Sequence, residues 1–171
     1  MNTITGKVWA HPGMIDTNQI LPQQYWMQKY GELDLAALGK HAMEGLDATF
    51  AEKALAGEYS FIVAGENFGG GGKSMEHPIY ALKGVGIKAV IAESVSRYFF
   101  RNMINNGVLV LIKHDISSFA NTGDEIAISP GEGTIRNITQ GTATKFEPMP
   151  EFLTKIVESG GYIDYLKKAG S

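Results

Sequence analysis

A short run in the middle of the chain combines four glycines with a lysine and a serine, a composition suited to binding an anion. The run reads Gly69-Gly70-Gly71-Gly72-Lys73-Ser74. Glycine lets the backbone turn sharply and lets its N–H groups approach a ligand closely, and a loop that opens a helix attracts negative charge. Lys73 and Ser74 would add a positive charge and a hydroxyl. The predicted ligand is a carboxylate or a phosphate, and the alternative is a flexible, solvated glycine turn.

Two well-known nucleotide-binding patterns do not fit this run. A P-loop would end as Gly72-Lys73-Ser74, but its opening glycine falls on Asn67. The dinucleotide pattern Gly-x-Gly-x-x-Gly needs its second glycine at Asn67 when it starts at Gly65, and it ends on Ser74 when it starts at Gly69. Neither pattern therefore predicts a nucleotide site.

The elements around the loop predict where it lies. Phe61–Ala64 reads as a buried strand before the loop, and a helix is predicted after it, over Ile79–Val85. Two more buried strands, Ala89–Ala92 and Val108–Ile112, enclose a helix predicted over Tyr98–Asn105. This alternation is typical of right-handed parallel crossovers, which present functional loops at the carboxyl ends of the strands.

The rest of the chain completes an α/β fold. A strand is predicted over Ile4–Trp9, a helix over Leu33–Leu38, and one or two helical pieces within Ala42–Leu55. Turn signals at Gly123-Asp124 and Gly131-Glu132-Gly133 predict a C-terminal hairpin region, with the strands Glu125–Ser129, Thr134–Ile138 and Thr144–Phe146. Helices are predicted over Glu151–Ser159 and Tyr162–Lys168. We expect a single domain that spans residues 1–171.

Composition excludes several function classes. The net charge is −3, and no basic run is longer than two residues, so nucleic acid is not an expected partner. The chain has no cysteine, which rules out disulfides, thiolate zinc sites and any iron–sulfur cluster ligated by its own thiolates. No apolar run approaches the length of a membrane span, and the first residues lack the apolar stretch of a signal peptide. We expect a cytoplasmic protein without membrane contact.

Ordered segments along nearly the whole chain resemble the small subunit of 3-isopropylmalate dehydratase, whose swivel domain is shared across the aconitase superfamily. The likeness is carried by Ala64-Gly65-Glu66-Asn67-Phe68-Gly69, Glu76-His77, Ala81-Leu82-Lys83-Gly84-Val85-Gly86-Ile87-Lys88-Ala89-Val90-Ile91-Ala92 and Arg101-Asn102-Met103-Ile104-Asn105-Asn106-Gly107. The opening of the chain is similar to that of the family at Ile15-Asp16-Thr17-Asn18-Gln19-Ile20-Leu21-Pro22, and its end is similar at Phe146-Glu147-Pro148-Met149-Pro150-Glu151-Phe152-Leu153.

The resemblance implies an aconitase-type swivel domain of β/β/α architecture that closes over a large subunit. It implies a hydro-lyase of leucine biosynthesis that acts on a small hydroxy dicarboxylic acid. The [4Fe-4S] cluster of such enzymes is expected in the partner large subunit, so no cofactor is expected on this chain. The small subunit of the family contributes a carboxylate-binding loop and a serine base.

This loop departs from the pattern of the family, Gly-Cys-Gly-Ser-Ser-Arg-Glu-His. When Glu76-His77 is aligned, Lys73 stands at the first serine, Ser74 at the second and Met75 at the arginine. The first serine is the base in the family, so we name Ser74 and Lys73 as catalytic candidates and Gly71, Gly72, Lys73 and Ser74 as substrate-binding candidates. Lys73 could donate as a point charge, act as a base or be an exposed loop lysine. Methionine cannot replace the bidentate carboxylate contact of arginine.

A second departure follows the segment Pro22-Gln23-Gln24-Tyr25. Trp26 and Met27 are bulky and apolar, so they are candidates for contacting an apolar substituent of the substrate. The alternative for Trp26 is packing in the core or against the partner. His77 is expected to be structural. Arg97 and Arg101 are expected near the carboxyl edge of the sheet, where either could approach an acidic substrate, and the favoured alternative is a surface salt bridge.

The sequence is consistent with three functions. The first is the dehydratase of isopropylmalate itself. The second is a related dehydratase of another substrate, such as citramalate or dimethylmalate. The third is a non-catalytic anion-binding partner subunit, which the altered loop residues suggest.

Overall fold

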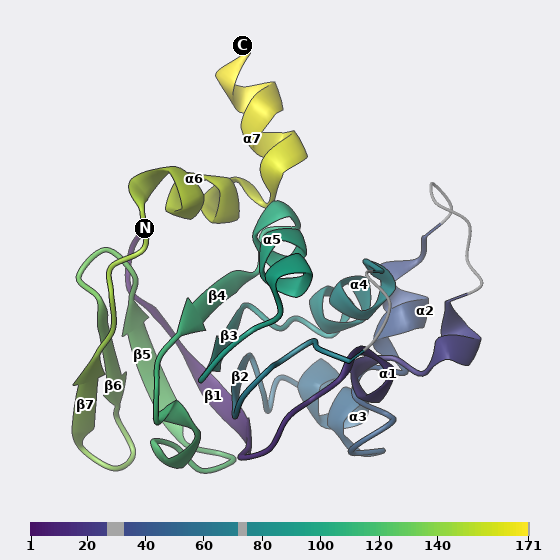
Figure 1. Cartoon of the computed structure of the whole chain (residues 1–171), viewed down its shortest axis with the longest axis horizontal. Coiled ribbons are helices and arrows are strands. Elements are labelled where there is room, and N and C mark those ends of the chain that lie inside the picture. Colours follow the sequence, from purple (N-terminus) through teal and green to yellow (C-terminus); the bar gives the residue numbers. More distant parts are fainter. Residues whose placement is uncertain (27–32, 72–74, 171) are drawn as a thin grey trace.

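The computed structural model describes residues 1–26, 33–71 and 75–170 (Figure 1). The strands form one sheet and are β1 (Ile4–His11), β2 (Phe61–Ala64), β3 (Ala89–Ala92), β4 (Leu109–Ile112), β5 (Glu125–Ser129), β6 (Thr134–Asn137) and β7 (Thr142–Lys145). The helices are α1 (Thr17–Ile20), α2 (Leu35–Gly39), α3 (Phe50–Leu55), α4 (His77–Gly84), α5 (Arg97–Asn105), α6 (Glu151–Ser159) and α7 (Tyr162–Ala169). Two short 3-10 turns, η1 (Gln23–Tyr25) and η2 (Ile116–Ser118), complete the described elements.

The sheet has seven strands in the order β4-β3-β2-β1-β5-β6-β7. Strand β1 joins its two halves. Its second half, from Val8, pairs in parallel with β2, and its first half, from Ile4, pairs antiparallel with β5. Strands β2, β3 and β4 continue the parallel half, and β6 and β7 continue the antiparallel half. The predicted parallel crossovers and C-terminal hairpin region are therefore both present.

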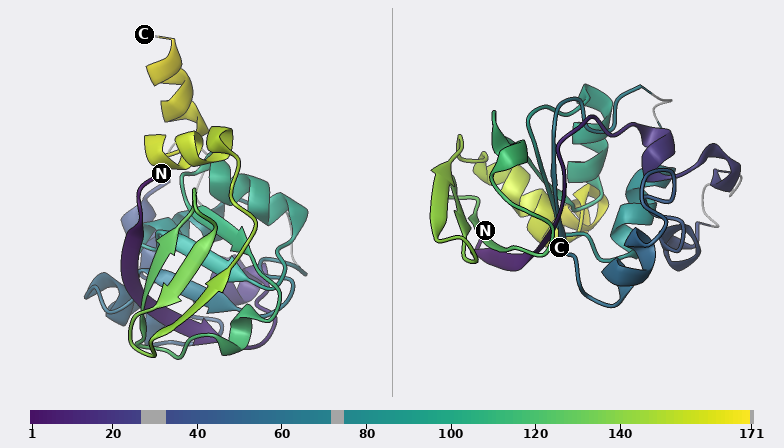
Figure 2. Two further views of the ribbon diagram at one scale, coloured as in Figure 1. Left: turned by 90° about the vertical axis from the view of Figure 1, so that its left-hand side faces the viewer. Right: turned by 90° about the horizontal axis from the view of Figure 1, so that it is seen from below.

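The central parallel strands are buried on both faces. All four residues of β2 and of β3 are buried, as near-continuous apolar strands of α/β proteins are. Figure 1 shows α1 to α4 on one side of these strands and β5 to β7 on the other. Figure 2 shows the antiparallel ribbon turned across the parallel strands. This arrangement confirms the predicted α/β fold of the swivel type.

The antiparallel ribbon is closed by a buried carboxylate. Asp124 accepts hydrogen bonds from Asn137 Nδ2 at 2.9 Å, from Gln140 Nε2 at 2.6 Å and from the backbone N–H of Asn121 at 2.9 Å. These hydrogen bonds hold the pKa of Asp124 below its usual value, and the bond from Asn137 has the largest effect, followed by that from the Asn121 backbone. Burial of the carboxyl group opposes this shift but is outweighed. This carboxylate ties the start of β5 to the end of β6.

Most predicted elements agree with the observed ones within one or two residues, as is usual for element ends. The strands at Phe61–Ala64, Ala89–Ala92 and Glu125–Ser129 and the helix at Glu151–Ser159 are confirmed with the predicted bounds. Four predictions are off by two residues at one end. The helices expected to begin at Leu33 and Ile79 begin at Leu35 and His77. The strand expected to end at Trp9 ends at His11, and the strand expected to begin at Thr144 begins at Thr142.

The prediction of helix through Ala42–Leu55 was wrong in its first part. Residues 40–46 form turns, and the helix α3 covers only Phe50–Leu55. Met43 has a φ of 60°, which no right-handed helix contains. Gly45 also packs closely on Asn18: a Cβ at residue 45 would lie 2.8 Å from the carbonyl oxygen of Asn18. Tertiary packing therefore overrides local helix propensity in this segment.

No helix in the part of the chain that the structure describes is long and apolar enough to cross a membrane.

Candidate functional site

The carboxyl ends of the four parallel strands lie at one edge of the sheet. They are His11, Ala64, Ala92 and Ile112. The glycine loop leaves this edge directly after β2, and its residues Gly65 to Gly71 are within the described part of the chain. Ligand sites of open α/β sheets form at this position.

The segment that follows β1 holds one side of the loop. The backbone N–H of Gly69 donates to the carbonyl oxygen of Ile15 at 2.8 Å, and that of Thr17 donates to Gly70 at 3.3 Å. Asp16 and Gly70 thereby form an isolated parallel bridge. The same Asp16 caps α1, where its side chain accepts from the Gln19 N–H at 2.8 Å. A fixed helix start therefore supports the glycines.

The segment between β3 and α5 holds the other side. The N–H of Phe68 donates to the carbonyl oxygen of Ser94, and the N–H of Ser96 donates to that of Phe68, both at 3.0 Å. Both serine hydroxyls also take part: Ser94 Oγ accepts from the Asn67 N–H at 2.8 Å, and Ser96 Oγ donates to the Gly69 carbonyl at 2.9 Å. The first half of the loop is thus fixed between two neighbouring connections.

Two of the glycines are required by packing. Gly69 has a φ of 70°, and a Cβ there would clash with the ring of Phe99. A Cβ on Gly70 would clash with the side-chain amide of Asn67. Gly71 also has a positive φ, of 72°, but it is exposed, and among the described residues a Cβ there would meet only Asp16, at 3.4 Å. All three glycines therefore serve the conformation of the loop, and contacts with neighbouring side chains restrict the first two further.

The described residues contain only part of the predicted site. Gly71 lies at the carboxyl edge, whereas Gly72, Lys73, Ser74 and Met27 lie outside the described residues. Trp26 is half-buried against the core, and its Nε1 donates to the carbonyl oxygen of Leu21 at 2.9 Å. This packing corresponds to the alternative drawn from the sequence, and a substrate contact by Trp26 stays a prediction.

The segment after the loop enters α4. Met75 is half-buried, and His77 is buried in the first turn of the helix. The side chain of Glu76, at the N-cap position, accepts a hydrogen bond from the Tyr80 hydroxyl at 2.9 Å. Burial of His77 fits the structural role expected for it.

Positive charge gathers beside the loop on α5. Arg97 and Arg101 are exposed one turn apart at the start of this helix. Within residues 1–26, 33–71 and 75–170, neither guanidinium has an ion-pair partner. The N-terminal end of the helix adds partial positive charge in the same place. The same edge also carries the carboxylates of Glu66 and Glu93, which follow β2 and β3, so the positive charge is confined to the start of α5.

Sequence reasoning missed the residues that hold the loop. Ser94 and Ser96 gave no motif, although Ser96 stands two residues before the predicted helix start at Tyr98, close to where serine is a common cap. Asp16 and Thr17 are both candidate helix caps in the sequence, and Asp16 is the one that caps α1. The backbone N–H of Thr17 bonds to Gly70, and its buried hydroxyl has no hydrogen-bond partner among the described residues.

No group of three or more His, Cys, Asp or Glu residues that could hold a metal ion occurs in the described ranges. In the described part of the site, the N–H groups of residues 67–70 all donate to partners within the fold, so this part fixes where the loop runs, and the arginines of α5 add positive charge beside it.

A family model described as the aconitase C-terminal domain matches residues 15–115, which contain the loop and the parallel strands β2, β3 and β4. The chain thus has the fold and the loop position of an aconitase-type swivel domain.

Curated relatives match over nearly the full length. An isopropylmalate/citramalate isomerase small subunit from Methanocaldococcus jannaschii is 41% identical, over 96% of this chain and 94% of the relative. A 3-isopropylmalate dehydratase small subunit from Aliarcobacter butzleri is 42% identical, over 98% and 96%. The crystal structure of a 3-isopropylmalate dehydratase from M. jannaschii matches with a TM-score of 0.86 at 34% identity, covering 98% of this chain and 95% of that one. The chain belongs to the 3-isopropylmalate dehydratase small-subunit family.

Proposed function

We propose that this chain is the small subunit of a heteromeric hydro-lyase that dehydrates and isomerises a hydroxy dicarboxylic acid of the 3-isopropylmalate and 2-isopropylmalate type. The observation that carries the proposal is the full-length match to named dehydratase small subunits. The glycine loop at the carboxyl edge gives that match a chemical basis. In this proposal residues 1–171 act as one swivel domain in the cytoplasm, and turnover requires a large subunit.

The [4Fe-4S] cluster belongs to the large subunit in this proposal. This chain has no cysteine, so its residues do not fit as cluster ligands. The cluster would supply Lewis-acid chemistry toward the hydroxyl and a carboxylate of the substrate. The small subunit then has two tasks: to bind the remaining carboxylate and to take a proton from carbon.

The loop beyond Gly71 performs both tasks in this proposal. Its backbone N–H groups and the ammonium of Lys73 bind the substrate carboxylate. Ser74, or Lys73 in its neutral form, takes the proton from the carbon next to that carboxylate. The first half of the loop supports this function, because hydrogen bonds to Ile15 and Ser96 fix where the second half begins.

Substrate choice is proposed to depend on apolar contact. Trp26 and Met27 follow η1 and would face the alkyl substituent of the acid. Met75, where the family has arginine, removes one bidentate carboxylate contact, so a point charge on Lys73 carries more of the binding. Citramalate is a second substrate to consider, since the name of the M. jannaschii relative includes citramalate. Dimethylmalate is a third.

The test is turnover by the reconstituted complex. This chain and the large subunit of the same source are combined anaerobically with a restored cluster and offered 3-isopropylmalate, 2-isopropylmalate, citramalate and dimethylmalate. Formation of the conjugated unsaturated acid is followed by absorbance. We expect turnover of at least one acid, and we expect Ser74→Ala or Lys73→Ala to lower kcat by about 10²–10⁴-fold, the usual effect of losing a general base.

Lys145→Ala is the matched control, because Lys145 is exposed on β7 in the antiparallel ribbon. If neither loop variant lowers turnover, the assignment of this loop is wrong. If the complex forms with an intact cluster and no acid is turned over, the chain either acts on an acid outside this panel or is a non-catalytic anion-binding partner.

A further inference from the structure

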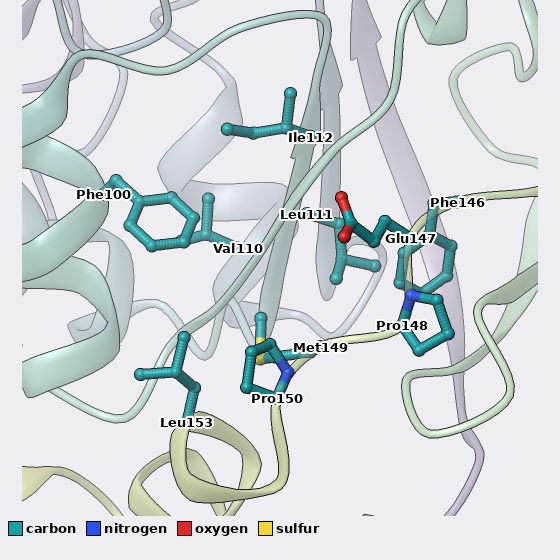
Figure 3. Close-up of a pocket in the computed structure, with 10 residues that line it drawn as sticks. All are labelled: Phe100, Val110, Leu111, Ile112, Phe146, Glu147, Pro148, Met149, Pro150 and Leu153. Carbon is teal, nitrogen blue, oxygen red and sulfur yellow. The ribbon is translucent and has the colours of Figure 1, made fainter.

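A cavity of about 300 Å³ lies between β4, α5 and residues 146–150 (Figure 3). Nine of its ten lining residues are apolar, and Glu147 supplies the one carboxylate. Small-molecule sites orient their ligands with several placed polar groups, so this lining is poorly suited to select one. A cluster of polar and aromatic side chains lies elsewhere, in the turn between α2 and α3 on the helical side of the sheet (Figure 1).

Residues 41–45, which we call the α2–α3 turn, contain a strained backbone. Met43 is fully buried and has a φ of 60°, a left-handed conformation that is costly for any residue but glycine. Strain of this kind persists only where the surrounding structure fixes it, and it gathers at functional sites. The contacts of the turn therefore indicate what it holds.

The turn is attached to the helix that supports the glycine loop. The backbone N–H of Met43 donates to the carbonyl oxygen of Ile20, the last residue of α1, at 2.6 Å. The first residue of α1 is Thr17, whose N–H donates to Gly70. The α2–α3 turn and the glycine loop are therefore attached to opposite ends of the same short helix.

Two side chains of the turn hold the aromatic ring that follows this helix. The ring of Tyr25, in η1, stacks on that of His41, with 3.7 Å between the centroids and 11° between the planes. The Tyr25 hydroxyl donates to Glu44 Oε1 at 3.1 Å. The second carboxylate oxygen, Oε2, accepts from His41 Nδ1 at 2.6 Å. One carboxylate thus bonds to both rings and fixes them against each other.

The residue after Tyr25 is Trp26, which is proposed above to contact the substrate. The Trp26 backbone N–H donates to Gln23 at 3.0 Å, and its Nε1 donates to Leu21 at 2.9 Å. Both of these bonds are local. Among the described residues, the polar contacts that tie η1 to a distant part of the chain are those of Tyr25 with the α2–α3 turn. The place of Trp26 on the domain therefore depends on this turn.

We propose that His41 and Glu44 are positioning residues for substrate choice. Through Tyr25 they hold Trp26 in the place from which it contacts the alkyl substituent of the acid. This role rests on the proposed function, which supplies that contact. It also accounts for the strain at Met43, which lies between His41 and Glu44 and turns the chain so that both side chains reach Tyr25.

The proposed role predicts which acids are affected. An isopropyl substituent offers Trp26 more apolar surface than the methyl group of citramalate, and each further carbon in apolar contact adds to discrimination between substrates. Carboxylate binding and proton transfer stay with the glycine loop. Loosening of Trp26 should therefore change the choice between acids more than the catalytic step.

Fluorescence of the free full-length subunit tests the positioning without turnover. The chain has two tryptophans, so Trp9→Phe leaves Trp26 as the single emitter. In that background, quenching of Trp26 by acrylamide should rise by about 2-fold or more in His41→Ala and in Glu44→Ala, because η1 would open locally. His41→Phe keeps a ring for Tyr25 to stack on and should restore most of the protection.

Lys155→Ala is the matched control, because it breaks an exposed ion pair on α6, where Lys155 Nζ lies 2.8 Å from Glu151 Oε1. It should leave the quenching of Trp26 unchanged. The side chains of His41 and Glu44 are 36% and 38% exposed, so their loss should leave the domain folded, which circular dichroism verifies. Quenching equal to the parent in both His41→Ala and Glu44→Ala would overturn the positioning role.

Turnover at saturating large subunit tests substrate choice. In His41→Ala and Glu44→Ala, kcat/KM for 3-isopropylmalate should fall by about 10-fold relative to that for citramalate, while Lys155→Ala keeps the ratio of wild type. If the wild type accepts a single acid, its KM should rise by a similar factor with kcat little changed. Wild-type turnover with an unaltered ratio or KM in both variants would overturn the role in substrate choice. No turnover by the wild-type complex would instead sink the proposed function, and quenching would still decide whether the turn positions Trp26.

Discussion

The hydroxyl of Ser96 donates a hydrogen bond of 2.9 Å to the carbonyl oxygen of Gly69. Ser96 is the N-cap residue of α5, yet its side chain makes no bond within its own helix. Its hydroxyl instead connects the charged start of α5 to the glycine loop. We therefore regard Ser96 as a positioning residue for the chemistry proposed beyond Gly71.

Removal of this hydroxyl should loosen the loop. We expect Ser96→Ala to reduce the free energy of unfolding by about 0.5–1.5 kcal/mol, the net value of one hydrogen bond. Because small displacements of catalytic groups are costly, kcat should fall by about 10-fold or more. KM should change less than kcat, and Ser96→Thr should restore most of the rate. Steady-state kinetics and urea unfolding measure both effects.

Ser118→Ala is the control for that experiment. Its hydroxyl also donates to a backbone carbonyl, that of Asp115 at 3.4 Å, from an exposed position in η2. Equal rates for Ser96→Ala and Ser118→Ala would contradict the positioning role.

Substitution of Gly69 and of Gly57 distinguishes two reasons why a position requires glycine: a positive φ and a lack of space for a Cβ. Both have positive φ, of 70° and 81°, but a Cβ on Gly69 clashes with Phe99 whereas one on Gly57 meets nothing within 4 Å. Gly57→Ala should cost about 1–2 kcal/mol for the left-handed backbone alone. Gly69→Ala should cost a further ~1–3 kcal/mol because it overpacks the ring. Chemical unfolding of both variants measures the difference, and equal losses would show that Phe99 moves aside freely.

The parallel half of the fold was accessible to sequence reasoning because its signals are local. Phe61–Ala64 and Ala89–Ala92 are short apolar runs, and helices of the expected length separate them. The pairing of β1 was not accessible, since its two halves join β2 and β5, and β5 lies more than a hundred residues away. Pairing across such a distance leaves no local pattern.

The site was accessible only in part. Glycine spacing located the loop, because glycine is needed where backbone turns tightly. The reasons at Gly69 and Gly70 are contacts with Phe99 and Asn67, which no spacing indicates. The bonds from Ser94 and Ser96 join segments that meet only in the folded chain.

The Asp124 carboxylate should make stability depend on acid pH. Hydrogen bonds, that from Asn137 first, hold its pKa below the ordinary value of 3.8. A carboxyl with a lowered folded-state pKa stabilises the protein above the unfolded-state pKa and loses that contribution as pH falls through the lower folded value. Asp124→Asn should cost about 1–3 kcal/mol at pH 7, because a neutral amide oxygen accepts more weakly than the charged Oδ2 from its three donors.

Urea unfolding as a function of pH measures this contribution. The stability difference between wild type and Asp124→Asn should be constant above about pH 5 and should shrink below the unfolded-state pKa, near 4. A difference that stays constant down to pH 2 would show that the carboxylate charge contributes nothing.

Thr17 presents the opposite case, a buried hydroxyl without a hydrogen-bond partner among the described residues. A buried hydroxyl without a partner costs about 1–3 kcal/mol, and valine has nearly the same shape. Thr17→Val should therefore raise the free energy of unfolding of the free subunit. The backbone N–H of Thr17 bonds to the carbonyl oxygen of Gly70, so this residue is attached to the loop. We expect the same substitution to lower kcat/KM. A hydroxyl that lowers the stability of the free subunit is best explained if it forms a hydrogen bond with the loop or the substrate during turnover.

Thr154 provides the comparison that decides this prediction. It is equally buried, at 3% exposure against 2% for Thr17, but its hydroxyl donates to the Glu151 carbonyl at 2.8 Å. Thr154→Val should therefore destabilise the subunit by about 1 kcal/mol and leave the kinetics unchanged. If Thr17→Val destabilises the free subunit as Thr154→Val does, the hydroxyl of Thr17 is already satisfied within the fold. If it stabilises the subunit and slows turnover, the hydroxyl is held for function at the expense of stability.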